Sequence, residues 1–172
     1  MTKDPQVLKC SSIKQFKRVL SEQPEIVHEL GGMFLRLFGK VEVLKVLIEA
    51  GVDINDVDFD WETALHIAAK DGDIPKAKLL IDSGADINAT NIHGYTPLMA
   101  SVESGSYKMT KFLLEQKADP NISETLRRPA LYFALTDKSI ELLKLLIAHG
   151  GRTNGTTLKG VDVWKWLKKR AA

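Results

Sequence analysis

The sequence predicts an all-α solenoid of about five stacked helix–turn–helix units, with short β-turn or hairpin loops and a capping unit at each end. The first observation is internal similarity: residues 58–90 return 33 residues later as 91–123, and a more divergent copy covers 124–156. The second is register, since the same period separates Leu47, Leu80, Leu113 and Leu146, and also Asn55, Asn88, Asn121 and Asn154. A fixed period in the thirties is typical of proteins built from stacked repeats.

Three short segments carry a resemblance to a known family. Residues 63–66 read Thr-Ala-Leu-His, residues 96–98 read Thr-Pro-Leu, and residues 84–88 read Gly-Ala-Asp-Ile-Asn. These segments closely resemble the ankyrin repeat, and the resemblance covers nearly the whole chain. It implies an ankyrin-repeat solenoid that forms one domain over residues 1–172 and binds another protein without catalysis.

The leading part of the chain predicts one capping unit and one divergent unit. In residues 1–27, apolar residues recur at helical spacing from Ile13 to Leu20, as a unit with a single neighbour requires. In residues 28–57 the segment 41–48 predicts a second helix with a good apolar stripe. Its first helix departs from the family pattern, so either that helix tilts away from its neighbour or the register differs over residues 28–38.

The unit 58–90 gives the clearest helix boundaries. Thr63 is placed to cap its first helix, and Gly72 supplies the backbone freedom to end it. Asp73 with Pro75 then begins the second helix. Within the two helices, Ala68 and Ala69 allow close approach, and an inter-unit core is expected from Leu79, Leu80, Leu113 and Leu114.

The last part of the chain predicts one more unit and a closing helix. In the unit 124–156 the turn residues and the inter-helix glycine are replaced, but the apolar pattern of residues 140–147 is intact. Residues 157–172 are expected to form a C-terminal capping helix, amphipathic from Val161 onward, with basic residues near its end to complement the helix dipole. No linker and no second domain are expected.

Composition excludes several functional classes. The net charge of +2 is too small to favour nucleic acid or an anionic membrane. Cys10 is the single cysteine, which excludes an intramolecular disulfide, and no apolar run is long enough to span a membrane. We therefore expect a cytoplasmic monomer, and we interpret the three Asn-x-Ser/Thr matches as products of the repeat.

The chain shows no motif for catalysis, a cofactor or a metal. The four histidines fall in different units, and His66 occupies a position where the resemblance implies a structural hydrogen bond between loops. The acidic run that begins at Asp56 fails as a calcium loop, because its sixth and twelfth positions hold Trp61 and Ile67. No phosphate-binding loop or nucleophile motif is present. We expect no enzyme activity, no cofactor and no metal.

The resemblance implies that a partner protein binds a concave strip made of the turn tips and the ends of the first helices. Packing is expected to constrain none of these positions. The candidate residues are Phe59, Asp60, Trp61, Glu62, Lys70, Asp71, Ile92, His93, Tyr95, Glu103, Ser104, Leu126, Arg127 and Arg128.

Two features of this strip are suggestive, and each has an alternative. Phe59 and Trp61 are large aromatic residues at an expected turn, so they either bind a partner or fold back over their own unit. Residues 53–62 carry five carboxylates, whereas Arg127 and Arg128 lie two units further along the chain. This separation of charge would orient a partner. An ordinary solvated surface gives the same pattern. The protein would act as an adaptor or as an inhibitor, for instance as a neutraliser of one specific kinase or toxin enzyme. An enzyme or a nucleic-acid binder are the competing classes.

Overall fold

The computed structural model describes residues 13–22, 41–136 and 139–152. Their helices are α2 (Ile13–Glu22), α4 (Val41–Glu49), α5 (Ala64–Asp71), α6 (Ile74–Asp82), α7 (Pro97–Glu103), α8 (Tyr107–Glu115), α9 (Ala130–Thr136) and α10 (Ile140–Ala148). In this described part there is no strand, and the only bridges are the isolated pairs Val57–Thr63 and Ser123–Pro129. The expected first helix of the unit 28–57 and the closing helix 157–172 lie outside the described residues.

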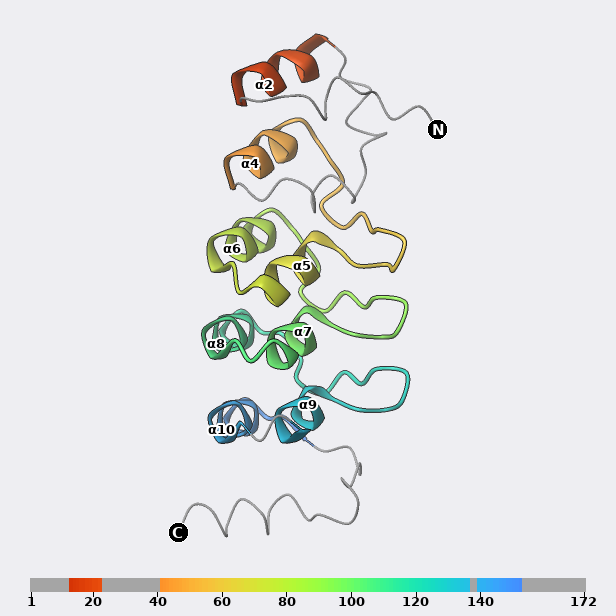
Figure 1. Cartoon of the computed structure of the whole chain (residues 1–172), viewed down its shortest axis with the longest axis vertical. Helices are drawn as coiled ribbons and strands as arrows, with labels where there is room; N and C mark the ends of the chain where they lie inside the picture. Colours follow the sequence, from red (N-terminus) through yellow and green to blue (C-terminus); the bar gives the residue numbers. More distant parts are fainter. Residues whose placement is uncertain (1–12, 23–40, 137–138, 153–172) are drawn as a thin grey trace.

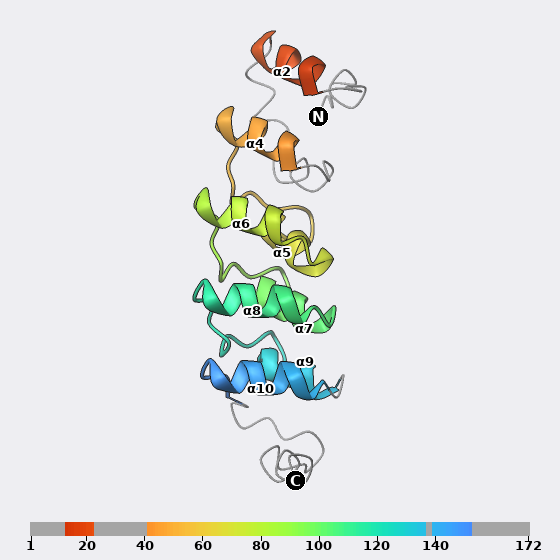
Figure 2. The ribbon, with the colours of Figure 1, turned by 90° about the vertical axis from the view of Figure 1, so that its left-hand side faces the viewer.

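The helices stack in two columns, which confirms the all-α repeat solenoid (Figure 1). The first helices of successive units, α5, α7 and α9, form one column, and the second helices α4, α6, α8 and α10 form the other (Figures 1 and 2). α2 continues the second column beyond α4. Three extended loops project from the side of the first column, one above the other (Figure 1).

The helix boundaries follow local rules. Gly72 adopts a left-handed conformation with φ 71° at the end of α5, and the amide of Asp73 donates to the Ala68 carbonyl over 3.0 Å. The Asp73 carboxylate then accepts from the Lys76 amide over 3.0 Å, which caps α6. Thr96 caps α7 in the same way, by accepting from the Met99 amide over 3.3 Å. Gly72 and Asp73 therefore have the roles that the sequence predicted, and Thr63 is the N-cap residue of α5.

The core is a row of equivalent side chains between the two columns. Leu47, Leu80, Leu113 and Leu146 are all fully buried, and Ala68 and Ala69 are buried where helices approach. Leu79, which we expected in the core, is only half-buried at the edge of this row. The core is thus a repeated layer with one large leucine from each second helix at its centre.

Asparagine side chains link each unit to the next. The Asn55 side-chain oxygen accepts from the Asp86 amide over 2.8 Å, Asn88 does the same for Asp119 over 2.9 Å, and Asn121 for Arg152 over 2.9 Å. The carboxylates of Asp53, Asp86 and Asp119 each accept from the amide two residues later, which fixes these turns. These aspartates are therefore structural.

Candidate functional site

Three loops, residues 58–62, 91–95 and 124–128, share one internal design. The first residue of each loop provides an acceptor side chain for backbone amides two and four residues later. Asp58 Oδ1 accepts from the amides of residues 60 and 62, both over 2.9 Å. Asn91 Oδ1 accepts from residues 93 and 95, both over 3.0 Å. Each loop thus holds its own shape without help from a sheet.

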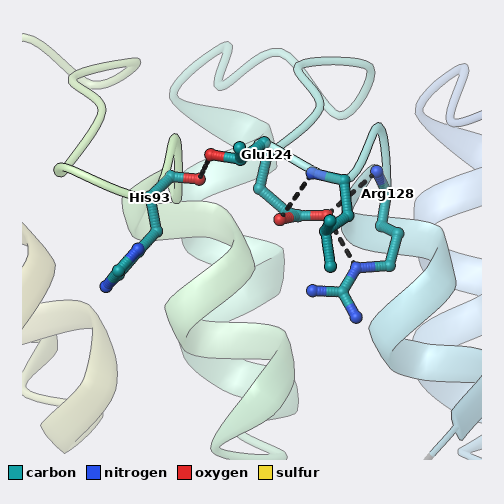
Figure 3. A network of polar contacts seen from close by, with 5 residues as sticks. His93, Glu124 and Arg128 are labelled. Atoms are coloured by element: carbon teal, nitrogen blue, oxygen red, sulfur yellow. Dashed lines mark hydrogen bonds and ion pairs between the residues drawn. The ribbon is translucent and has the colours of Figure 1, made fainter.

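Neighbouring loops are bonded tip to tip. The Ile92 amide donates to the Asp60 carbonyl over 3.0 Å, and the Thr125 amide donates to the His93 carbonyl over 2.9 Å. The Thr125 hydroxyl donates to the same His93 carbonyl over 2.6 Å (Figure 3). The three loops therefore form one continuous surface.

Large apolar side chains stand on the tips of these loops. Phe59 is 83% exposed, Trp61 59%, Ile92 55% and Leu126 66%. We call these four residues the tip row. Phe59 and Ile92 occupy the same position in successive units, and their loops are hydrogen-bonded to each other. The possibility that Phe59 and Trp61 fold back over their own unit is therefore wrong, because both side chains face solvent.

Trp61 stands at a backbone position that favours glycine. Its φ is 59°, in the left-handed region, and the residue 33 positions later is Gly94, with φ 79°. The third member of this register, Arg127, has φ 62°. A left-handed conformation costs a non-glycine residue about 1–2 kcal/mol. Such local strain is concentrated at functional sites, and at Trp61 it coincides with an exposed aromatic side chain.

A groove of about 240 Å³ lies beside the tip row, between α5 and α7. It is lined by Glu62, His66, Lys70, Tyr95, Ala100, Glu103 and Ser104. The structure thus brings five of the sequence-predicted candidates into one groove. His66 and Ala100 were missed as groove residues, although both positions lie on the predicted first helices.

His66 forms the buried end of this groove. Its Nδ1 lies 3.2 Å from the Thr63 amide nitrogen and 2.9 Å from the Thr63 hydroxyl, and its Nε2 lies 2.9 Å from the Tyr95 carbonyl oxygen. An Nε2–H tautomer suits this arrangement, because Nδ1 then accepts from the Thr63 amide and Nε2 donates to the Tyr95 carbonyl. Burial lowers the pKa of His66 despite the bond to Tyr95, so the ring is neutral at pH 7. The histidine has the loop-linking role that the resemblance implied.

Arg128 is held in place by its neighbours, so the expectation that packing constrains none of the candidate positions is wrong. Its Nε donates to the buried Glu124 carboxylate over 2.6 Å (Figure 3), and its guanidinium lies 5.1 Å from the Tyr132 ring centroid. Glu124 also accepts from the amides of Leu126 and Arg128, over 3.0 and 3.2 Å. Only Arg127 remains as an exposed base on this loop. The sequence contained a sign of the role of Glu124, because this residue occupies the same repeat position as the loop acceptors Asp58 and Asn91.

These contacts also determine the ionisation of the pair. Burial by itself would raise the pKa of Glu124, but the hydrogen bonds from Arg128 and the two amides together lower it. The bond to Glu124 raises the pKa of Arg128. The pair is ionised at neutral pH and belongs to the structure of the third loop.

Four further candidates are exposed around the tip row and the groove. Asp60, His93 and Arg127 are exposed on the loops, and Asp71 is exposed at the end of α5. Tyr95 is also constrained by packing, contrary to the expectation, because it is half-buried against the core and its ring centroid lies 5.0 Å from that of Phe133. Among the described residues, no group of three His, Cys, Asp or Glu side chains is placed to hold a metal ion. No helix within these residues has the length and apolarity needed to cross a membrane.

Comparison with known families agrees with this geometry. A family model described as ankyrin repeats, in three copies, matches residues 33–124, which is more than half of the chain. A search of curated proteins found no significant match.

Proposed function

The chain belongs to the ankyrin-repeat family, and from this premise we propose that it binds one partner protein through the tip row and the adjoining groove. Ankyrin repeats are generally protein–protein interaction modules and are generally not catalytic. The fourteen candidate residues lie on or beside this face, with Arg128 acting from within the third loop. We propose that the protein acts as an adaptor, or as an inhibitor that covers a functional surface of its partner.

The observation that carries this proposal is the tip row on its hydrogen-bonded loops. Large apolar side chains that are exposed on neighbouring, hydrogen-bonded loops are typical of interaction sites, whereas scattered ones need no explanation. Tryptophan is enriched among the residues that dominate binding energy, often about 2 kcal/mol or more each. Trp61 keeps a conformation that glycine would adopt without strain. Binding to a partner, rather than stability of the fold, would explain a tryptophan at this position.

Loops that are already ordered also favour binding. The amide–carbonyl bonds from Ile92 to Asp60 and from Thr125 to His93 hold the loops together before a partner arrives. Association then loses less conformational entropy than it would with free loops. This supports a face that meets its partner as a largely rigid surface.

The test compares the wild type with a Phe59→Ser/Trp61→Gly double variant in affinity purification followed by quantitative mass spectrometry. Glycine at 61 relieves the left-handed strain, so the variant should remain folded while it loses its specific partner. Tyr107→Ser is the matched control, because Tyr107 is an exposed aromatic residue on α8, away from the loops. We expect this control to retain the partner. Recovery of the same proteins by all three chains would contradict the proposal.

A further inference from the structure

We propose that the groove receives a lysine or arginine side chain from a partner segment whose neighbouring apolar side chains rest on the tip row. This inference rests on the proposed function and names the chemistry of the partner. The occupant is a short basic–apolar segment of another protein.

The walls of the groove carry an excess of negative charge. Glu62 and Glu103 line it from two neighbouring units, and Lys70 is the single cationic side chain among its lining residues. Within the part of the chain that the structure describes, neither glutamate forms an ion pair, with Lys70 or with any other residue. His66 contributes no compensating charge at neutral pH, because burial lowers its pKa. A second cation supplied by a partner would complement these walls.

The surroundings reinforce this polarity. The loops 58–62 and 91–95 contain no lysine or arginine, and the first of them contains Asp58, Asp60 and Glu62. The exposed base Arg127 stands on the third loop. A positively charged segment would therefore approach over the first two loops and be repelled by the third, which sets its orientation.

The dimensions of the groove suit one side chain. Pockets for small molecules usually measure about 300–1,000 Å³, so a groove of about 240 Å³ is small for a free ligand. A side chain presented by a protein needs less room because the rest of its chain lies outside. Tyr95 lines the groove, and its contact with the Phe133 ring, at 5.0 Å between centroids, holds it in place. A tyrosine ring that lines a groove together with two glutamates is a favourable surface for an ammonium or guanidinium group.

The tip row supplies the apolar half of the site. Trp61 is followed directly by Glu62, so the exposed indole and the acidic wall of the groove come from adjacent residues. Phe59 and Ile92 extend the apolar surface across two loops. A segment that places a base next to large apolar residues would contact both parts at once.

The experiment uses the full chain and three fluorescent libraries of twelve-residue peptides. All three have Leu, Phe or Trp on either side of a fixed central residue, which is Arg in the first, Ala in the second and Glu in the third. Fluorescence anisotropy measures the Kd of each library, at low and at physiological salt. We expect the Arg library to bind about tenfold or more tightly than the Ala library, and the difference to shrink as salt rises. Equal affinity of the Arg and Ala libraries would overturn the inference.

Isosteric variants test whether the preference for the Arg library arises in the groove. Glu62→Gln/Glu103→Gln keeps the shape of the groove and removes both charges, so it should abolish the preference for Arg over Ala. Asp82→Asn/Glu115→Gln is the matched control, since it changes the net charge equally on exposed side chains of α6 and α8 that form i,i+4 pairs. This control should leave the preference intact. An equal loss in both variants would show a general charge effect and would contradict the assignment to the groove.

Charge reversal separates this inference from the function on which it rests. A Glu62→Lys/Glu103→Lys variant should prefer the Glu library to the Arg library. If Phe59→Ser/Trp61→Gly loses the cellular partner but Glu62→Gln/Glu103→Gln retains it fully, the docking face is correct and the basic segment is wrong. If neither variant loses the partner, both proposals fail.

Discussion

At the scale of single residues, each loop depends on the acceptor with which it begins. Asp58 and Asn91 reach their amides with one oxygen, whereas the longer Glu124 uses both carboxylate oxygens and recruits Arg128. The lowered pKa of Glu124 means that its contribution to stability is present above the unfolded value of about 4.3 and is lost as the pH falls through the folded value. The longer acid, together with Arg128, thus adds a partly buried ion pair to the loop cap.

His66 gives the fold a second, higher pH dependence. Its pKa is lowered in the folded state, so protons bind more readily to the unfolded chain. Stability from the neutral ring is therefore fully present above pH ~6.5, the unfolded value, and is lost as the pH falls through the folded pKa. Protonation would also take away the acceptor at Nδ1 that holds the Thr63 amide.

The protein should lose stability at mildly acid pH because His66 becomes protonated more readily in the unfolded chain. Urea unfolding of the wild type at pH 8 to 5 should show a loss of free energy below about pH 6.5. His66→Gln should be less stable than the wild type at pH 8, and the gap between the two should narrow as the pH falls. Parallel curves for the two proteins would mean that another group causes the acid sensitivity.

At the scale of helices, stability comes from stacking rather than from the helices themselves. The helices of the units 58–90 and 91–123 have 7 to 9 residues, and isolated helices shorter than about 12–15 residues are marginal in water. Caps such as Asp73 and Thr96 determine where each helix begins, but burial of one face against the neighbouring unit keeps it folded. The second helices contribute the central leucine of each layer.

Truncating that leucine should therefore be costly. Leu80→Ala removes a fully buried side chain from α6 and should lower the free energy of unfolding by about 2–5 kcal/mol. Leu79→Ala is the matched control, because Leu79 is the adjacent residue and is only half-buried. Its loss should be clearly smaller in urea titrations. Equal unfolding midpoints for Leu80→Ala and the wild type would refute the alignment of the layers.

At the scale of the whole molecule, the stack turns local repeats into one extended face. Each unit contacts its neighbours in the stack, and the asparagine links and the loop-to-loop bonds follow the same order. In such solenoids, cooperativity depends on the interfaces between adjacent units. The tip row and the groove exist only because neighbouring units are held in register.

Breaking one link should weaken both stability and cooperativity. Asn88→Ala removes the acceptor for the Asp119 amide and should cost about 1 kcal/mol. It should also lower the urea m-value, as the units on either side unfold more independently. Thr90→Ala, an exposed substitution two residues away, should change neither quantity. An unchanged m-value in Asn88→Ala would place the coupling in the leucine core instead.

Much of the fold can be read from the sequence, because its determinants are local or recur at a fixed period. The leucine period predicted the layers, and Gly72 and Asp73 predicted helix boundaries from neighbours within a few residues. The resemblance of residues 63–66 to the ankyrin repeat assigned His66 its role.

The tertiary structure alone decided the chemistry of the face. It placed Phe59 and Trp61 in solvent, removed Arg128 into an ion pair with Glu124, and brought Glu62 and Glu103 together from different units. Period and caps depend on contacts within one unit or between identical positions, so they leave a trace in the sequence. Exposure and the groove depend on how unlike side chains of neighbouring units meet, and that geometry exists only after the units have stacked.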